Sequence, residues 1–264
     1  MIHLKNITKF FHRNSVNEVL ALNDISLKVE EGEFITVIGS NGAGKSTSLN
    51  CIAGSFFPDQ GSLEVNGQDI TRWPEYKRAK FIARVFQDPL RGTCANASIE
   101  QNMSLAKLRG KKRGLGIGVK KRDREFFREE LKQLDLGLEK RLLDTAGLLS
   151  GGQRQALTML MATMQRPEVL LLDEHTAALD PKTAAQVLDL TERIVREKKL
   201  TTLMVTHQMK DALRLGNRLI MFHRGKIIFD VKGQEKQNLT VKDLLAKFYE
   251  IQGEELSSDK MLLA

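Results

Sequence analysis

Hydrophobic and polar positions follow two different patterns along this chain, and each pattern predicts a different kind of element. Residues 25–29 alternate between apolar and polar side chains, which predicts a strand with one buried face. The segment from Gly61 to Ile70 contains Asn66-Gly67, a pair typical of the turn in a β-hairpin. We therefore expect the N-terminal part of the chain to form an antiparallel β layer.

Other strand-like segments are apolar throughout. Val169 to Leu172, which follows Pro167, is a short continuous run of the kind typical of a strand buried on both faces of a parallel sheet. Phe34 to Ile38 is a second apolar run, and Ala83–Phe86 and Leu203–Thr206 are also strand-like. Because such strands are separated by helical stretches, the sequence predicts an α/β fold.

Between Gln87 and Leu149 the pattern becomes helical. Phe127, Leu131 and Leu134 lie on one face of a segment that is otherwise rich in Lys, Arg and Glu. The sequence therefore predicts a helical lobe inserted into the α/β fold.

The apolar run at Phe34 to Ile38 leads into a glycine-rich loop. Residues 39–46 read Gly-Ser-Asn-Gly-Ala-Gly-Lys-Ser and fit the phosphate-loop pattern, with a helical stretch from Thr47 to Ala53 behind them. Glycines let backbone N–H groups converge on phosphate oxygens, and the helix points the positive end of its dipole at the same anion. We expect Lys45 to reach the β- and γ-phosphates of a nucleotide and the Ser46 hydroxyl to ligate Mg²⁺.

Two carboxylates, Asp173 and Glu174, follow the buried run. In open α/β sheets, ligands bind beyond the carboxyl ends of the strands. We therefore expect Asp173 to hold the water shell of the metal ion and Glu174 to orient and deprotonate an attacking water. The alternative is that both are acids favoured at a helix N-terminus by its dipole.

A second glycine-rich turn reads Leu149-Ser150-Gly151-Gly152-Gln153. Ser150 supplies a hydroxyl, the two glycines let the backbone approach a γ-phosphate, and a helix from Gln153 onward would face the anion with its N-terminus. The same residues also form an ordinary capped helix start, and the two interpretations are compatible.

Taken in order, these segments resemble the ATP-binding subunit of an ABC transporter, from about Leu4 to Asp230. The resemblance implies an α/β fold with a P-loop NTPase core, a mostly parallel sheet, an N-terminal antiparallel β layer and an inserted helical subdomain. It further implies a single ABC-type ATPase domain at residues 1–240, with the helical subdomain at about 88–155, and a short helical tail at 241–264. The segments in question are the phosphate loop, Gln87, Leu149 to Gln153, Asp173-Glu174, Ala178-Leu179-Asp180 and His207.

The resemblance also implies that two subunits pair head to tail and share their ATP sites, so that residues 149–153 of one subunit close over ATP on the phosphate loop of the other. Its catalytic set is Glu174, His207, Gln87 and Lys45, with Asp180 reporting across the interface. Its Mg²⁺ set is Ser46, Gln87 and Asp173. Its ATP-binding set is Phe11, Gly39, Ser40, Asn41, Gly42, Ala43, Gly44, Lys45, Ser46, Thr47, Ser150, Gly151, Gly152, Gln153 and Asp180.

The adenine contact and the residue after Glu174 are less clearly defined by the resemblance. Phe11 is the candidate for stacking on adenine, although the adjacent Phe10 could fill that role, and a core position for both is the ordinary alternative. His175 departs from the family pattern, because many relatives carry a small residue or proline after the glutamate. This departure leaves the roles of the other residues unchanged.

Bulk properties suggest where the protein acts. No apolar run approaches the length of about eighteen residues required to span a bilayer, and Met1 to Asn6 has no signal-peptide core. We expect a cytoplasmic protein held on the inner face of the cell membrane by a separate permease. Cys51 and Cys94 have no C-x-x-C spacing, so metal and redox roles are not expected for them.

The net charge of +8 is concentrated in residues 109–124, where glycines interrupt the basic clusters and predict a flexible loop. This segment is either a solvated charge run or a contact with anionic lipid or an acidic permease loop. The resemblance places the docking surface for the permease at Phe86 to Asn102.

Two classes of function remain. The leading one is the ATPase subunit of a transporter, with import favoured and amino acids, aromatic ones among them, as the implied cargo class. The other is a soluble ATPase of the same architecture that acts on nucleic acid, ribosomes or cluster assembly. The expected partners are a second copy or a homologous ATPase subunit, integral membrane permease subunits and, indirectly, an extracellular substrate-binding protein, whereas nucleic acid is not expected. The expected cofactors are ATP and Mg²⁺.

Overall fold

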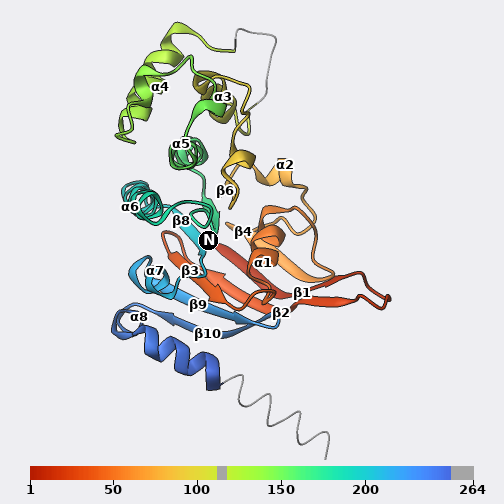
Figure 1. The fold of residues 1–264 in the computed structure, drawn as a ribbon. Coiled ribbons are helices and arrows are strands. Elements are labelled where there is room, and N and C mark those ends of the chain that lie inside the picture. Colours follow the sequence, from red (N-terminus) through yellow and green to blue (C-terminus); the bar gives the residue numbers. More distant parts are fainter. Residues whose placement is uncertain (112–117, 251–264) are drawn as a thin grey trace, which may run out of the picture.

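The computed structural model describes residues 1–111 and 118–250. Two β-sheets occupy one end of the molecule, and the helices α3, α4 and α5 lie together at the other end (Figure 1). The α/β class that the sequence predicts is confirmed, with both an antiparallel and a mostly parallel sheet.

The antiparallel sheet has the strand order β2-β1-β4-β5. It is formed by β1 (Ile2–Phe11), β2 (Val19–Val29), β4 (Gln60–Val65) and β5 (Gln68–Asp69). The expected hairpin is present, because β4 pairs with β5 around the turn at residues 66–67. In β2, residues 25, 27 and 29 are buried while residues 26 and 28 are exposed, as the alternating pattern predicts.

The second sheet has the order β10-β9-β3-β8-β7-β6. Its pairings from β9 to β6 are parallel, and β10 runs antiparallel to β9 at the edge. The four strand-like segments predicted from the sequence all belong to it. The bounds are β3 (Phe34–Gly39), β6 (Ile82–Val85), β7 (Val169–Asp173), β8 (Thr201–Val205), β9 (Arg218–His223) and β10 (Lys226–Lys232).

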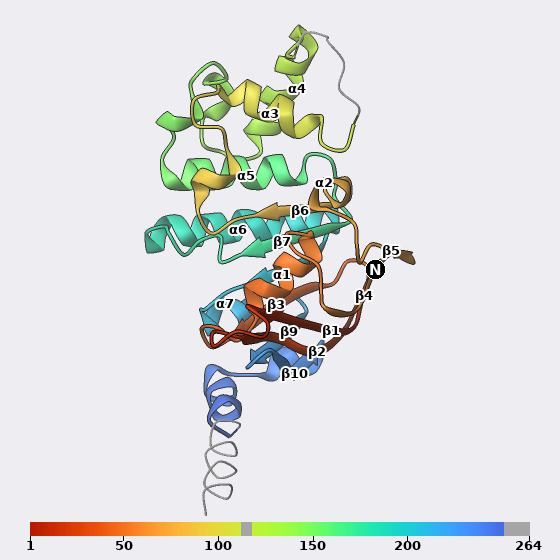
Figure 2. The same ribbon diagram turned by 90° about the vertical axis from the view of Figure 1, so that its right-hand side faces the viewer.

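Helices follow the strands and cover the sheet. α5 and α6 are stacked on one side of the parallel sheet, next to β6 and β7 (Figure 2). Residues 241–250 are also helical. The bounds are α1 (Lys45–Ala53), α2 (Glu75–Arg78), α3 (Ile99–Lys107), α4 (Lys121–Lys132), α5 (Gly151–Thr163), α6 (Pro181–Lys198), α7 (Met209–Arg214) and α8 (Gln234–Asn238), with 3-10 turns η1 (Pro89–Gly92), η2 (Leu138–Lys140) and η3 (Ala146–Leu148).

Two details differ from the sequence-based expectation. Leu134 is buried with Phe127 and Leu131, but it lies beyond the C-terminal end of α4, in the turn that follows. The basic segment is not a loop throughout, because residues 121–124 form the first turn of α4 and Arg109 donates a hydrogen bond to the carbonyl of Ala162. Residues 112–117 and 251–264 lie outside the described residues.

The parallel sheet is buried on both faces, and its side chains alternate between two apolar clusters. In β7, Val169 and Leu171 pack with α1 and the antiparallel sheet, whereas Leu170 and Leu172 pack with the helical side. A third cluster joins β9, β10 and α7 to residues 241–250, through Leu244. The predicted tail therefore begins with a helix that packs on the core.

Arg78 is a fully buried cation that sequence patterns did not indicate. Its guanidinium donates to the carbonyl oxygens of Cys51 and Ile52 at 2.7 and 2.8 Å, near the C-terminal end of α1. It also donates to the carbonyls of Thr71 and Trp73. Because the last carbonyls of a helix have no partners within the helix, these bonds fix the end of α1, whose other end carries the phosphate loop.

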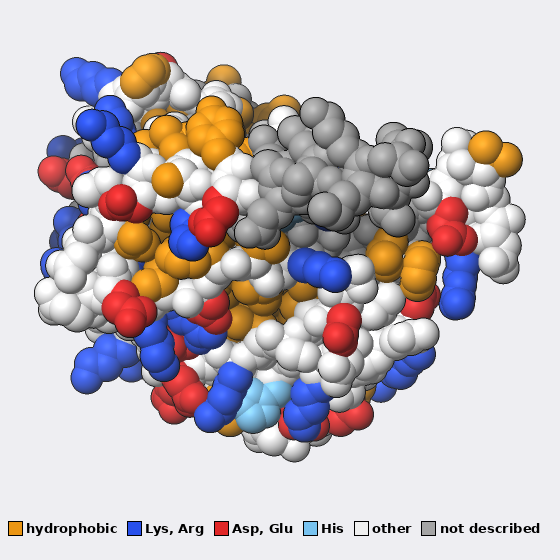
Figure 3. Space-filling model, turned by 90° about the horizontal axis from the view of Figure 1, so that it is seen from below, with side chains coloured by type: hydrophobic (Ala, Val, Ile, Leu, Met, Phe, Trp, Pro, Cys, Tyr) orange, Lys and Arg blue, Asp and Glu red, His pale blue; other side chains and the backbone are white. Residues whose placement is uncertain are grey.

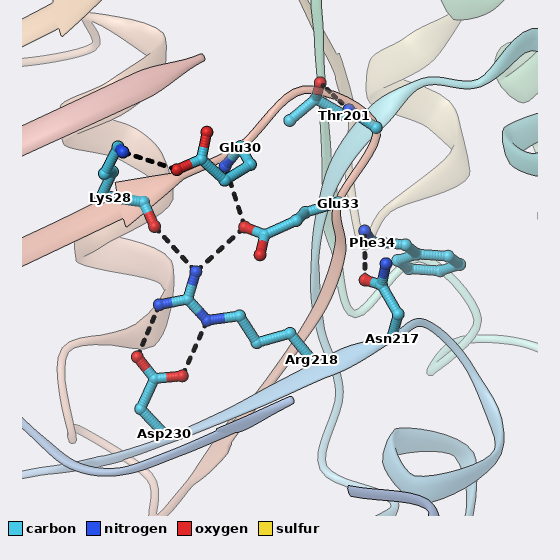
Figure 4. A network of polar contacts seen from close by, with 9 residues as sticks. Lys28, Glu30, Glu33, Phe34, Thr201, Asn217, Arg218 and Asp230 are labelled. Carbon is cyan, nitrogen blue, oxygen red and sulfur yellow. Dashed lines mark hydrogen bonds and ion pairs between the residues drawn. The ribbon is translucent and has the colours of Figure 1, made fainter. Parts of the chain in front are cut away.

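Arg218, on β9, joins the two sheets near the N-terminal end of β3. Its guanidinium donates to both carboxylate oxygens of Asp230 on β10, at 2.7 and 2.6 Å, and to Glu33 at 3.0 Å (Figure 4). It also donates to the carbonyl of Lys28 on β2 at 2.7 Å. The carboxylate of Asp230 raises the pKa of Arg218, despite the opposing effect of partial burial. This network ties β2, β9 and β10 together.

Charge is mixed on the face seen from below. Lys and Arg side chains lie beside Asp and Glu side chains, with hydrophobic side chains between them (Figure 3). The positive net charge is therefore not gathered into one basic patch on this visible face.

The Arg218 network gives a prediction about stability. Replacing Arg218 with Met should lower the free energy of unfolding by about 3 kcal/mol, because the 11 % exposed Glu33 side chain would lose its partner cation. The matched control is Arg214→Met, which removes an ion pair with Asp189 whose side chains are 45 and 65 % exposed, and it should cost less than about 1 kcal/mol. Urea denaturation measures both; equal losses would show that the buried network adds nothing special.

Candidate nucleotide-binding site

The loop between β3 and α1 depends on glycine at particular positions. At Gly39, with φ 147°, a Cβ atom would lie 2.2 Å from the carbonyl oxygen of Phe222, so the loop leaves β3 in direct contact with β9. Gly44, with φ 101°, precedes α1 in the left-handed region, where a Cβ would lie 2.6 Å from the carbonyl oxygen of Ala21. The first N–H groups of α1 have no partners within the helix and are available to an anion.

Lys45 is buried inside this loop. Its ammonium donates to the carbonyl oxygens of Gly39 and Ser40, each at 2.9 Å. Burial lowers the pKa of Lys45, and the nearby carboxylates of Glu174 and Asp173 act in the opposite direction. The loop thus curls around one cation, at the place where the sequence predicts phosphate groups.

Ser46 and Asp173 meet although they are far apart in the sequence. The Ser46 hydroxyl donates to Oδ1 of Asp173 at 2.9 Å. The other carboxylate oxygen, Oδ2, accepts from Nη2 of Arg84 on β6 at 2.8 Å, and Nη1 of Arg84 donates to the Asn50 side chain at 2.5 Å. Arg84 and Asn50 were not singled out from the sequence; the available signal was a charged residue within an otherwise apolar strand.

Glu174 and His207 lie at the ends of the neighbouring strands β7 and β8. Nδ1 of His207 is 3.7 Å from Oε2 of Glu174, and the His207 side chain is 51 % exposed. Glu174 has φ 44°, which is uncommon for a residue with a side chain and turns the chain sharply after β7. Both side chains therefore stand at the carboxyl edge of the sheet, beside the phosphate loop.

His175 points the other way, into the core. It is 1 % exposed, and burial lowers its pKa to about 4. Its Nε2 is 3.0 Å from the Thr191 hydroxyl, which itself donates to the carbonyl of Val187. The hydroxyl is thus the acceptor for His175, which places a proton on Nε2. Because burial lowers its pKa to about 4, the imidazole is neutral near pH 7. This residue contributes to packing against α6 rather than to the site.

The second glycine-rich turn forms its own cluster. Ser150 caps α5: its hydroxyl accepts from the N–H of Gln153, whose side chain accepts from the N–H of Ser150, both at 3.2 Å. A Cβ atom at Gly152 would lie 2.1 Å from Cγ2 of Thr183 on α6, so this glycine allows two helices to touch. Asp180 caps α6 by accepting from the N–H of Thr183, and this hydrogen bonding lowers its pKa.

These two clusters are separate within one chain. In residues 1–111 and 118–250, no hydrogen bond or ion pair joins Ser150, Gln153 or Asp180 to the phosphate loop. The sequence-predicted residues Gly39, Ser40, Lys45, Ser46, Asp173, Glu174 and His207 form the first cluster, and Ser150, Gly151, Gly152, Gln153 and Asp180 form the second.

The remaining candidates lie around the first cluster. Gln87 is exposed in the segment after β6, and Asn41 and Gly42 are exposed at the tip of the loop. Ala43 is buried and accepts from the N–H of Gly225, while Thr47 is partly buried on α1. Phe11 packs edge-on against Phe56 at 5.3 Å, whereas Phe10 lies under the guanidinium of Arg13.

Two kinds of feature are absent from the described residues. No group of three or more His, Cys, Asp or Glu side chains in that part of the chain could hold a metal ion on its own. Nor does any described helix combine the length and apolarity required to cross a membrane.

Comparisons with known proteins agree with this geometry. A family model described as ABC transporter matches residues 22–177. The chain is 46% identical over 248 residues to a tyrosine transport ATP-binding protein of Clostridioides difficile, covering 94% of this chain and 98% of the relative. It is 34% identical over 235 residues to a thiamine import ATP-binding protein of Salmonella choleraesuis, covering 89% and 92%.

A solved structure is also similar. The dimeric ATP-binding cassette in a post-hydrolysis state, bound to ADP and Pi, has a TM-score of 0.74 and 30% identity, covering 88% of this chain and 98% of that one. The chain therefore belongs to the ABC transporter family. Within that family it is an ATP-binding subunit, an ATPase coupled to transport.

The buried His175 predicts a pH dependence of stability. Its pKa falls from 6.5 to about 4 on folding, so its contribution is present above pH 6.5 and is lost as the pH falls towards 4, where the unfolded chain binds a proton that the folded chain does not. Over that window, wild type should lose up to about 3 kcal/mol more stability than His175→Leu. Denaturant unfolding from pH 7 to pH 4 measures this difference.

The control for this measurement is His12→Leu, at an exposed position. That variant should follow the wild-type pH profile. Parallel profiles for wild type and His175→Leu would contradict the assignment of a neutral, buried imidazole.

Proposed function

We propose that this chain is the ATPase subunit of an importer, that two copies act as a head-to-tail pair, and that ATP is hydrolysed between them. The observation that carries the proposal is the division of the predicted residues into two clusters within one chain. Each cluster is half of a site: one offers a phosphate loop with carboxylates, the other offers a capped helix start. A head-to-tail pair brings the first half of one copy to the second half of the other.

The first cluster fits a nucleotide with Mg²⁺. Lys45 and the N–H groups at the start of α1 supply the positive charge that phosphates require. Ser46 and Asp173, joined at 2.9 Å, offer the hard oxygen ligands that Mg²⁺ prefers, and Gln87 completes the proposed set. When bound, Mg²⁺ would neutralise charge on the β- and γ-phosphate oxygens.

Glu174 is the proposed general base. Its position after β7, with φ 44°, turns its carboxylate towards His207 instead of into the sheet. From there it can orient a water and accept its proton, while His207 donates a hydrogen bond to the γ-phosphate. Phe11, held by Phe56, is the proposed adenine contact, and Gly39 to Thr47 surround the phosphates.

The second cluster is proposed to act on the ATP of the partner copy. Ser150 and the N–H groups at the start of α5 would reach its γ-phosphate, with Gly151 leaving room for the backbone and Gln153 holding the cap. Asp180, at the start of α6, would register whether the two copies are closed. The proposed divisions of the chain are an ATPase domain at 1–240, a helical subdomain at about 88–155, and a tail at 241–264.

The proposed cargo is an amino acid, with aromatic amino acids as the first candidates. The name of one relative supports this, since it is a tyrosine transport ATP-binding protein. The proposed partners are integral membrane permease subunits that dock at residues 86–102 and, through them, an extracellular substrate-binding protein. The chain would then work on the cytoplasmic face of the membrane.

The role of Glu174 can be tested by Glu174→Gln. Loss of the base should lower the turnover number by at least about a hundredfold, while ATP still binds and holds the pair closed. Phosphate release and size-exclusion chromatography with ATP measure the two effects. The control is Glu197→Gln on the exposed side of α6, which should hydrolyse ATP like wild type. Rapid hydrolysis by Glu174→Gln would remove Glu174 from the mechanism.

The role of Lys45 can be tested by Lys45→Ala. Because the ammonium supplies charge-assisted hydrogen bonds to phosphate, its loss should weaken ATP binding at least about tenfold. Isothermal calorimetry measures the affinity directly. Lys210→Ala, at an exposed position in α7, is the matched control and should bind ATP normally. Unchanged binding by Lys45→Ala would contradict the proposed phosphate site.

A further inference from the structure

A groove of about 460 Å³ lies between β6, η1, α3 and α5. Three arginines line it: Arg84 from β6, Arg91 from η1, and Arg109 from the segment after α3. Cys94, an exposed free thiol, lines it as well. Among the described residues that line this groove there is no Asp or Glu, so its charge is positive.

Several polar atoms in the groove lack partners. Within the described chain, Nε of Arg84, Oγ1 of Thr93, and Nε and Nη2 of Arg109 are buried side-chain atoms without a hydrogen bond. Buried polar groups in native proteins are almost always hydrogen-bonded, so a cluster of unpaired ones calls for an explanation. Since most of these atoms are cationic donors, the missing partner is an acceptor, and a carboxylate matches them in both charge and hydrogen bonding.

Arg84 connects this groove with the nucleotide site. One end of its guanidinium donates to Oδ2 of Asp173 at 2.8 Å, and the two side chains are 12 and 13 % exposed. Its guanidinium carbon also lies 4.7 Å from the centre of the Phe86 ring, and that of Arg91 lies 4.6 Å from the same ring. Contacts between side chains therefore continue from Arg91 at the groove, through Phe86 and Arg84, to Asp173.

The charge of Arg84 has an electrostatic consequence at Asp173. A cation that already neutralises a carboxylate weakens the attraction of that carboxylate for a second cation. An anionic group bound in the groove would offset the charge of Arg84 and leave Asp173 more attractive to Mg²⁺. Such coupling is reciprocal, because each ligand changes the affinity of the other by the same factor.

We propose that Arg84 is a positioning residue shared by two sites, and that a carboxylate-bearing segment of the permease docked in the groove engages Arg84 and thereby strengthens Mg²⁺ binding at Asp173. This inference rests on the proposed function, because it takes Asp173 as the metal-binding carboxylate. The inference adds to the proposed function a carboxylate as the group that binds in the groove. It also adds a route, through Arg84 and not through Gln87, by which docking of the permease promotes nucleotide binding.

The first test compares nucleotide affinity with and without Mg²⁺. The dissociation constant of a fluorescent ATP analogue is measured in EDTA and in Mg²⁺. The value in EDTA divided by the value in Mg²⁺ is the ratio that gives the contribution of the metal ion to binding, and a higher ratio means a larger contribution. In Arg84→Met this ratio should rise about tenfold over wild type, because no cation neutralises Asp173. Arg84→Lys, which keeps the charge, should stay near the wild-type ratio.

The matched control is Arg214→Met, which removes an exposed guanidinium outside the groove whose ion pair is with Asp189 and not with Asp173. Its ratio should equal that of wild type. Urea unfolding of each variant verifies that it is folded. An unchanged or lower ratio in folded Arg84→Met would overturn the proposal and leave Arg84 with a packing role.

The second test supplies the missing carboxylate through Cys94. Alkylation with iodoacetate forms an S–C bond and releases iodide, leaving a carboxymethyl group in the groove; iodoacetamide leaves a neutral group of nearly the same size. Burial raises the pKa of the Cys51 thiol to about 11, so Cys94 reacts first, and mass spectrometry verifies a single modification. The probe is therefore a defined negative charge with a neutral counterpart.

Carboxymethylation of wild type should raise the ratio several-fold, whereas carbamidomethylation of wild type should leave it unchanged. Carboxymethylation of Arg84→Met should not raise the ratio of that variant further. Equal ratios for the two modifications would count against the groove as a carboxylate site. A failure of the proposed function gives a different result. If Mg²⁺ did not tighten nucleotide binding in unmodified wild type, Asp173 would not be the metal-binding carboxylate, independently of the ratios measured for the Arg84 variants.

Discussion

Burial of the parallel sheet on both faces is the constraint on which the rest of this structure depends. Val169 and Leu171 face one apolar cluster and Leu170 and Leu172 face the other, so neither face of β7 has room for polar chemistry. On β7, carboxylates are left only at the strand end, where ligands bind in open α/β sheets. The neighbouring strands β3, β8 and β7 therefore end at the phosphate loop, at His207 and at Asp173-Glu174, and residues distant in sequence become one site.

Much of this arrangement could be predicted from the sequence, because its signals are local. A continuous apolar run is short and self-contained, which is why β3 and β7 are found where the pattern places them. The phosphate loop is equally local, since its glycines, its lysine and its helix are consecutive. The sequence assigned Ser46 and Asp173 to one metal ion, and the structure brings their side chains together, because parallel strands bring their carboxyl ends to the same edge.

The buried arginines could not be predicted. Arg78, Arg84 and Arg218 have partners in segments distant from them in sequence, and a charged residue without a nearby partner in the sequence is ordinarily assigned to the surface. Leu134 shows the same limitation on a smaller scale. It keeps the helical spacing of Phe127 and Leu131, yet it is buried from the turn after α4, because burial depends on the neighbouring helices and not on the period alone.

The contact between Gly152 and Thr183 restricts which sequences this fold can accept. A methyl group at position 152 would overlap the γ-methyl of Thr183 at 2.1 Å, so an alanine there demands a smaller residue at 183 or a shift of α5 away from α6. Thr183 also supplies the N–H that Asp180 accepts. Positions 152 and 183 should therefore covary in evolution, because a larger residue at one is tolerated only with a compensating change at the other. The sequences at the starts of α5 and α6 thus constrain each other.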